Sequence, residues 1–403
     1  MDETRAMIPL ERAWALLDEA LSGRTPASEI IPVRSARGRL LASDQHTRLD
    51  LPPFDKSAMD GYAVRADDER DTYRLLATVR AGQVPSVALV PGTAVKVMTG
   101  APVPEGTGKV IMREFTEEDA ETVRVLRHDD VGNLCLRGED MKVGDRVLPA
   151  GCRLDALDLA NLVSCGLTRV PVTLPIELAV LSTGDEIVDD PACLAPGKIM
   201  NANGPMLAHL AAKHGFDVVG ERRIADDLDE TVSALGEALE AAEMVVVSGG
   251  VSVGDFDHVL EAFERLGLAV AFSRVAVKPG KPTVFATRGE KVVFGLPGNP
   301  VSVCLMFHLF VLRAARRLRG VPAVLRLGRR VLASNFARRK AERRGFAPVR
   351  LTDEGDVEPL PYHGSAHLMS LSRADGFLSV PIGVREVPAG ETVDFLDLRE
   401  PYQ

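Results

Sequence analysis

Three glycine-rich turns follow one another between Met244 and Ser302: Ser248-Gly249-Gly250, Lys278-Pro279-Gly280-Lys281 and Pro297-Gly298-Asn299-Pro300. Each follows or borders an apolar run of β type, and two lead into a segment with helical spacing. Glycine lets a backbone approach a ligand without a Cβ clash, and the N–H groups at a helix N-terminus attract anions. Because ligands of open α/β sheets bind at the carboxyl ends of strands, these turns predict a pocket for a phosphorylated ligand.

Charged residues accompany the turns. Lys278 and Lys281 flank Pro279-Gly280, where two ammonium groups can converge on one oxyanion; an ordinary surface hairpin is the alternative. Asp255 and Asp257 stand in the first turn of the following helix, where the helix dipole alone favours acids. The functional alternative is that Asp257 helps to hold a Mg²⁺ ion together with phosphate oxygens.

Further acids lie outside this stretch. Asp185 and Glu186 come directly after the strand predicted at 176–181, at the ligand end of the sheet. Asp226-Asp227 precedes Leu228 and also suits a helix cap. Asp60 and Asp140 lie on loops, where functional residues concentrate, although a solvated loop carboxylate is the simpler interpretation of both.

The histidines, the cysteines and the apolar runs argue against a zinc site, a disulfide framework and a membrane span. His363 and His367 lack the cysteine or acidic partners of a zinc site, so we interpret them as non-metal residues. The five cysteines are scattered, odd in number and without a Cys-x-x-Cys pair, which argues against a disulfide framework and favours a reducing cytoplasm. No signal-peptide pattern follows Met1, and the apolar run Val301–Leu312 is too short to span a bilayer.

The bulk composition narrows the choice of partners. The chain has 403 residues, a net charge of −9 and 46% hydrophobic residues, which suggests several domains and no general affinity for nucleic acid or acidic membranes. A local pocket can still bind an anion. The basic segment Arg313–Arg350 has two interpretations, a solvated surface or a nucleic-acid contact, and we favour the first.

The pattern of elements predicts an α/β fold joined to all-β modules. A helix is predicted at Pro9–Leu21, short strands in a small β module at Tyr73–Arg127, and alternating strands and helices from Ile176 onward. A long buried helix is expected at Asn299–Leu318, and the chain beyond Arg319 is β-rich again. Strand–helix alternation of this kind indicates an open α/β sheet.

Seven motifs in order carry a resemblance over nearly the whole chain. They are Pro53–Ala63, Met98–Pro102, Arg137–Asp140, Ser182–Glu186, Ser248–Asp257, Lys278–Pro282 and Leu296–Ser302. Together they resemble the molybdopterin molybdenumtransferases, the MoeA family that includes the E domain of gephyrin.

The resemblance implies a four-part, elongated subunit. It assigns residues 1–50 and 141–175 to a mixed helical and proline-rich N-terminal domain, 51–140 to a small β domain, 176–322 to a molybdopterin-binding α/β domain and 323–403 to a C-terminal β-barrel-like domain. It also implies a homodimer whose active site is shared between subunits. Molybdopterin adenylyltransferase and molybdoenzyme acceptors are further expected partners, and neither nucleic acid nor membrane is expected.

The implied reaction is the Mg²⁺-dependent insertion of molybdate into adenylylated molybdopterin, with release of AMP. The catalytic residues carried over by motif are Asp60, Thr99, Asp140, Glu186, Asp227, Asp257, Lys278 and Lys281, of which Glu186, Asp227 and Asp257 would bind the metal. The residues expected to bind the pterin substrate are Thr183, Gly184, Ser248, Gly249, Gly250, Ser252, Gly254, Pro297, Gly298, Asn299 and Pro300.

Two departures from the family pattern stand out. Lys56 replaces a common Asn, and Asn201-Ala202-Asn203 replaces a common Asp-Ser-Asn, which removes one carboxylate at 201. Two other functions stay open at this stage: a molybdopterin adenylyltransferase, against which the extra N- and C-terminal parts argue, and a non-catalytic scaffold like the gephyrin E domain.

Overall fold

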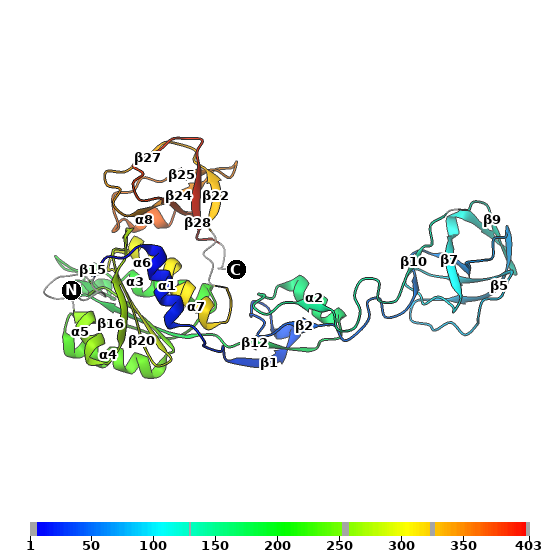
Figure 1. Cartoon of the computed structure of the whole chain (residues 1–403), viewed down its shortest axis with the longest axis horizontal. Helices are drawn as coiled ribbons and strands as arrows, with labels where there is room; N and C mark the ends of the chain where they lie inside the picture. The colour runs from blue at the N-terminus through cyan, green and yellow to red at the C-terminus, as the bar shows by residue number, and fades with distance from the viewer. Residues whose placement is uncertain (1–5, 129, 252–257, 323–326, 400–403) are drawn as a thin grey trace. The chain divides into compact units, whose positions relative to one another are not determined.

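The computed structural model describes residues 6–128, 130–251, 258–322 and 327–399. The chain divides into two compact units, which we describe separately (Figure 1). The larger unit combines Met1–Glu29 with Thr173–Gln403, and the smaller unit is Ile30–Val172.

The larger unit is built on a six-stranded sheet. Its strands lie in the order β16 (Asp217–Ile224), β13 (Glu177–Thr183), β17 (Met244–Ser248), β21 (Lys291–Leu296), β20 (Pro282–Arg288) and β18 (Ala269–Arg274). The first four are mutually parallel, whereas β20 pairs antiparallel with β21, and β18 pairs antiparallel with β20. The central strand β17 is buried at all five positions, as expected for a parallel strand covered on both faces. The predicted open α/β sheet is therefore present, with a mixed edge.

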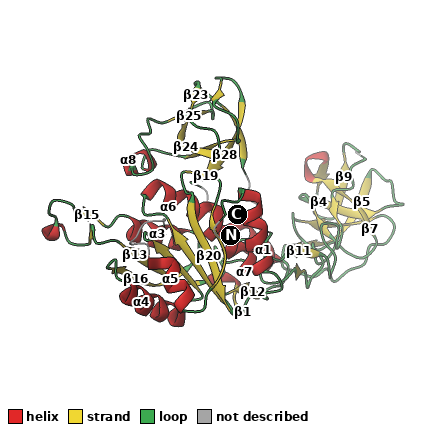
Figure 2. Ribbon diagram, turned by 60° about the vertical axis from the view of Figure 1, so that its left-hand side comes forward, coloured by secondary structure: helices red, strands yellow, loops and turns green. Residues whose placement is uncertain are grey.

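Helices cover both faces of this sheet (Figure 2). In β13, Leu178 and Val180 join the core that contains α3 (Asn203–Lys213), whereas Ala179 and Leu181 join the core that contains α4 (Leu228–Ala241) and α5 (His258–Arg265). This alternation follows the two-residue period of a strand. The helix α1 (Leu10–Ala20) also packs into the α3 core, through Leu10, Ala13 and Leu17, although the sequence division placed residues 1–50 with the N-terminal domain.

The helix predicted at Asn299–Leu318 is interrupted by a wider turn. It consists of α6 (Pro300–Met306), a π-helical segment at Phe307–Val311 and α7 (Leu312–Leu318). The Trp14 indole N–H of α1 donates to the Leu309 carbonyl at 3.0 Å. A tryptophan from a distant part of the sequence therefore bonds a backbone carbonyl of this segment.

The C-terminal sheet has the order β19 (Val277–Lys278), β24 (Arg344–Leu351), β26 (Gly376–Val380), β28 (Thr392–Asp397) and β22 (Gly328–Val331), with β25 (Val357–Pro359) against β24. Among the described residues the end strands β19 and β22 do not pair with each other, so this sheet is open and no closed barrel forms. Because β19 lies in the α/β part of the sequence, it joins the two sheets of the larger unit.

The smaller unit contains a second six-stranded sheet. Its order is β7 (Thr107–Met112), β4 (Gly61–Arg65), β6 (Thr93–Val97), β5 (Thr72–Val79), β9 (Thr122–Val125) and β8 (Thr116–Glu118). The rest of the unit has its own core, to which Val33 and Leu41 contribute from before this sheet and Leu162 and Val172 from after it. The helix α2 (Ala156–Ser164) carries Leu162 and begins with a capping box at Asp155.

Much of the basic segment is engaged within the chain. Arg313 and Arg317 pair with Asp18 at 2.6 and 2.7 Å, and Arg344 contacts Glu11 at 3.0 Å. These ion pairs support the interpretation of a structural, solvated surface. A search of the described residues for a helix long and apolar enough to cross a membrane found none.

Candidate active site

The glycine turns meet at one edge of the α/β sheet. In the parallel register Ser182 lies beside Ser248, and Ser248 lies beside Leu296, so three strands end together. The antiparallel strand β20 begins at the same edge, because its Val284 lies beside Gly295. A pocket of about 300 Å³ opens there, lined by Thr183, Gly184, Glu186, Asp226, Gly249, Gly250, Val251, Pro282, Pro297, Gly298 and Asn299.

Glycine is required in these turns because the turns pack on one another. Gly249 has a φ of +97°, and a Cβ there would lie 2.5 Å from the Thr183 carbonyl oxygen. Gly250 has a φ of +62°, and its Cβ would lie 3.0 Å from the Thr183 hydroxyl. Both positions also favour glycine through their left-handed backbone. The Gly249 N–H donates to the Leu296 carbonyl at 3.0 Å, which holds the first turn against the strand end that leads into the third.

Two carboxylates, Glu186 and Asp226, line the pocket. Glu186 lines the pocket as expected, but its companion is Asp226 rather than Asp227. Asp227 is the N-cap of α4, and its side chain accepts the Glu230 N–H at 2.8 Å. Asp226 and Asp185 exchange backbone N–H to carboxylate bonds at 3.2 Å each way. The position of Asp227 directly before Leu228 in the sequence is typical of such a cap.

Two buried oxygens near the turns lack a partner among the described residues: the Thr183 hydroxyl and the Asn203 side-chain carbonyl. The Asn203 amide nitrogen donates to the Gly298 carbonyl at 2.6 Å, so this residue ties α3 to the third turn. A buried polar atom without a partner is costly, and a ligand or water would satisfy these two. Asn203 was not among the predicted site residues, although it belongs to the Asn-Ala-Asn departure noted above.

The start of α6 offers less to an anion than its sequence indicates. Pro300 has no N–H, and the Val301 N–H donates to the Ser365 carbonyl at 3.1 Å. Asn299 occupies the N-cap without a side-chain capping bond. The third turn therefore contributes to the pocket through residues 297–299, whereas Pro300 is outside the lining.

Lys281 directly precedes Pro282, which lines the pocket, and Lys278 lies three residues before Lys281. Both side chains are exposed, and neither ammonium has a hydrogen bond or ion pair with the described residues. Lys278 lies in β19, paired with Gly345, and the intervening Gly280 packs closely on Met306, where a Cβ would lie 2.5 Å from its methyl carbon. The turn is thus held from both sides while its two cations stay available to an anion.

The remaining predicted residues belong to the smaller unit. One Asp60 carboxylate oxygen accepts both the Thr99 N–H and the Thr99 hydroxyl, at 2.7 Å each. These bonds lower the pKa of Asp60, the backbone N–H contributing most. Strand β3 (Lys56–Ser57) connects the loops: it pairs with β10 (Leu134–Cys135), and the Ser57 carbonyl accepts the Gly100 N–H at 2.8 Å. Asp140 lies on the loop after β10, exposed, with its N–H donating to Leu51.

Some predictions cannot be placed. Ser252, Gly254 and Asp257 lie outside the described residues. Ser248 is buried, with its hydroxyl 3.4 Å from that of Ser182.

His363 and His367 stack with ring centroids 5.2 Å apart. The described residues contain no group of three or more His, Cys, Asp or Glu side chains that could hold a metal ion. All five cysteines are free thiols.

Models of known protein families match three successive parts of this chain. Three family models match in order: the MoeA N-terminal region (domain I and II) at residues 8–166, the probable molybdopterin binding domain at 179–317 and the MoeA C-terminal region (domain IV) at 330–398. The fold and the pocket therefore belong to a multidomain protein built around a molybdopterin-binding type of α/β domain.

Full-length relatives then identify the family. A molybdopterin molybdenumtransferase of Staphylococcus aureus (strain Mu50 / ATCC 700699) is 33% identical, and the match covers 98% of this chain and 96% of the relative. The counterpart of Staphylococcus epidermidis is also 33% identical, over 89% of this chain and 88% of that protein. The crystal structure of the molybdopterin biosynthesis MoeA protein from Pyrococcus horikosii matches with a TM-score of 0.83 at 29% identity, over 98% of this chain and 100% of that one. The chain belongs to the MoeA family.

Proposed function

We propose that this chain inserts molybdate into adenylylated molybdopterin and releases AMP. The observation that carries the proposal is the end-to-end match, over 98% of the chain, to relatives named molybdopterin molybdenumtransferase. The pocket supports it chemically, because two carboxylates lie among glycine turns at the ligand end of the sheet, and Lys281 directly precedes the lining residue Pro282. Such parts suit phosphoryl chemistry, in which positioning and charge neutralisation dominate.

The described carboxylates fit a Mg²⁺ ion held partly by its substrate. Glu186 and Asp226 line the pocket, and Mg²⁺ sites of this kind use one or two carboxylates together with phosphate oxygens and water. When bound there, the ion would neutralise charge on the phosphoanhydride. Asp257 stays a proposed third ligand. The capping bond of Asp227 uses one of its two carboxylate oxygens, so a metal role for this residue is compatible with the cap.

The remaining residues bind and orient the substrates. Lys278 and Lys281 would attract molybdate or phosphate oxygens, because both ammonium groups are exposed and unpaired among the described residues. The Thr183 hydroxyl and the Asn203 carbonyl would hydrogen-bond the pterin substrate, because both are buried without a described partner. The closely packed glycine turns would let the phosphate groups of the substrate approach the backbone.

We propose further that the chain acts as a homodimer in the cytoplasm. In this arrangement Asp60, Thr99 and Asp140 of one subunit complete the pocket of the other. The support is the family resemblance together with the chemistry of these residues. Thr99 holds Asp60 in its charged form through two hydrogen bonds, and a charged carboxylate is able to act as an acceptor or a metal ligand.

Two alternatives are less well supported. A molybdopterin adenylyltransferase would not need the MoeA N-terminal and C-terminal regions, which flank the α/β domain here. A purely scaffolding protein would not need two unpaired lysines beside an acidic pocket. A binding role in addition to catalysis stays compatible with both observations.

The decisive experiment is AMP release from adenylylated molybdopterin in the presence of molybdate and Mg²⁺. Purified protein should release AMP, and Lys281→Ala and Asp60→Ala should lose most of the activity. Lys340→Ala, an exposed lysine on the C-terminal sheet side, is the matched control and should be fully active. No release above background would overturn the proposed reaction. Light scattering that finds only monomer at micromolar concentration would contradict the shared site.

A further inference from the structure

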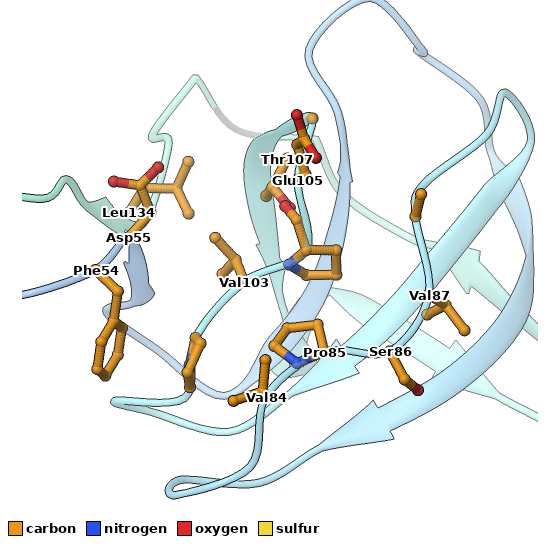
Figure 3. Close-up of a pocket in the computed structure, with 14 residues that line it drawn as sticks. Phe54, Asp55, Val84, Pro85, Ser86, Val87, Val103, Glu105, Thr107 and Leu134 are labelled. Atoms are coloured by element: carbon orange, nitrogen blue, oxygen red, sulfur yellow. The ribbon is translucent and has the colours of Figure 1, made fainter.

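The smaller unit has a second cavity that the proposed reaction does not use (Figure 3). It measures about 590 Å³ and lies between the segment Val84–Ala88 and the loop Pro102–Thr107, with Phe54, Asp55 and Leu134 completing its lining. The loop is anchored, because the Val103 N–H donates to the Asp55 carbonyl at 3.1 Å and the Thr107 N–H donates to the Pro104 carbonyl at 3.2 Å.

The segment from Val84 to Val90 forms no strand and bends at Val87, but its side-chain exposure alternates as it does in a strand. Its even-numbered residues are exposed, Val84 to 86% and Val90 to 50%, whereas Pro85 and Val87 are half-buried and Leu89 is buried. This two-residue alternation is that of an extended chain with one face on a core. Leu89 and Val87 pack against the core of the neighbouring sheet, which fixes the segment in place.

The backbone of this segment has no pairing partner. Turns secure both ends: the Gln83 N–H donates to the Arg80 carbonyl at 3.0 Å, and the Thr93 N–H donates to the Val90 carbonyl at 3.1 Å. Between the turns, the carbonyl groups of Val84–Ala88 and the N–H groups of these residues other than Pro85, which has none, form no hydrogen bond within the part of the chain that the structure describes. An anchored segment at the edge of a domain with unpaired backbone groups is a template for another strand.

The cavity beside this edge is apolar with an acidic rim. Its charged lining residues are Asp55 and Glu105, and no lysine or arginine lines it. In Figure 3 both carboxylates lie on the upper side of the cavity, opposite Phe54 and Val84. One Asp55 oxygen accepts the Arg137 N–H at 2.7 Å, whereas Glu105 has no partner among the described residues. Such a wall repels molybdate and phosphate, so the substrates of the proposed reaction do not suit it.

We propose that this cavity and its open edge bind an extended segment of a partner protein. The partner's backbone pairs with Val84–Ala88 as an added strand, an apolar side chain enters the cavity, and a lysine or arginine of the partner reaches Glu105 and Asp55. Strand addition supplies affinity through main-chain bonds, and pockets beside the edge supply specificity. The acidic rim selects a basic partner by charge complementarity.

Selection of random octapeptides on the full-length protein tests this proposal. Selected peptides should alternate apolar and basic residues, and fluorescence anisotropy should show them bound. N-methylation of alternate peptide amides should weaken binding about tenfold or more in one of the two registers, because it blocks one row of strand hydrogen bonds. Glu105→Lys should weaken binding about tenfold as well, whereas Glu114→Lys, an exposed acid of the same unit outside the cavity lining, should not.

The proposal is overturned if selection yields no binders, if the binders lack basic residues, or if binding survives Glu105→Lys or both methylation registers. Circular dichroism of Glu105→Lys should match the parent protein, because this side chain is exposed. AMP release by Glu105→Lys should equal that of the parent protein whether or not peptides bind. A failure of peptide binding therefore leaves the proposed reaction untouched, and a failure of AMP release leaves the peptide site untouched.

Discussion

A single carboxylate oxygen of Asp60 accepts two hydrogen bonds from Thr99, one from its backbone N–H and one from its hydroxyl, both at 2.7 Å. The two residues are 39 positions apart and come from different loops, which strand β3 brings together. The pair explains why a threonine belongs at 99. Its hydroxyl and its backbone act on the same acceptor and keep Asp60 ionised.

Thr99→Val should raise the pKa of Asp60, because the hydroxyl donor is lost while the backbone donor stays. We expect Thr99→Ser to keep both the hydroxyl donor and the backbone donor. Carbon-13 NMR titration of the Asp60 carboxyl measures this directly. In the proposed reaction, Thr99→Val should slow AMP release about tenfold or more, by analogy with the loss of one positioned donor. Equal pKa values for Asp60 in the valine and serine variants would refute this relationship.

The Gly249 turn should not tolerate a side chain. Gly249→Ala places a Cβ 2.5 Å from the Thr183 carbonyl oxygen at a φ of +97°, so we expect a loss of unfolding free energy of about 1–3 kcal/mol and a loss of AMP release. Gly220→Ala is the control, because a Cβ there meets nothing within 4 Å and its φ is not in the left-handed region. Chemical denaturation of both variants should separate them; equal stability would show that Thr183 does not constrain the turn.

The buried His308 should make the larger unit sensitive to acid. Burial lowers the pKa of His308 from 6.5 to about 4. Because the folded state holds the ring neutral while the unfolded state protonates near 6.5, His308 destabilises the fold progressively as the pH falls from about 6.5 toward 4. The contribution reaches about 3 kcal/mol at pH 4, at 1.36 kcal/mol per pKa unit.

The measurement is the free energy of unfolding as a function of pH. His308→Leu should flatten this dependence below pH 6.5, even if the variant is less stable at neutral pH. His209→Gln, at an exposed position on α3, should retain the parent profile. A profile for His308→Leu that is as steep as the parent's would contradict the assignment.

The ion pairs of Asp18 should stabilise the packing of α1 against α7. Burial raises the pKa of Asp18, but hydrogen bonds from Arg317 and Arg313 outweigh it and the net pKa is lowered. This stabilisation is present above the ordinary carboxyl pKa and is lost as the pH falls through the depressed value. Asp18→Asn should cost about 1–3 kcal/mol at neutral pH.

Glu237→Gln is the matched control for Asp18→Asn. Glu237 pairs with Arg222, but the two side chains are 66% and 47% exposed, against 16% for Asp18. An exposed pair is worth about 0–1 kcal/mol. Thermal unfolding at neutral pH should therefore distinguish the two substitutions, and an equal effect would mean that the partial burial of Asp18 adds nothing.

Removal of divalent metal should abolish the proposed AMP release. EDTA should stop the reaction, and excess Mg²⁺ should restore it. Asp226→Asn should raise the Mg²⁺ concentration needed for half-maximal rate, because Asp226 lines the pocket. Asp227→Asn should leave this requirement nearly unchanged, since asparagine is also a good N-cap. The reverse ranking would favour Asp227 over Asp226 as the metal ligand.

Much of the local structure of this protein can be predicted from its sequence. The run Met244–Val247 and the glycines that follow it indicate a buried strand and a ligand-facing turn, and the structure has both. The seven motifs were sufficient for the family. These features depend on short stretches of chain, in which residue type and spacing directly determine backbone conformation.

Tertiary packing decided the rest. Which of Asp226 and Asp227 lines the pocket depends on where α4 begins. Asp227 caps the helix, and Asp226 lines the pocket. The cost of a side chain at Gly249 comes from Thr183, 66 residues earlier. The backbone of Val84–Ala88 is left unpaired by the described residues that surround it, which no local pattern predicts. Asp60 meets Thr99 because β3 holds two loops together. Sequence specifies what each segment can do, whereas contacts between distant segments decide which groups are used and which stay free.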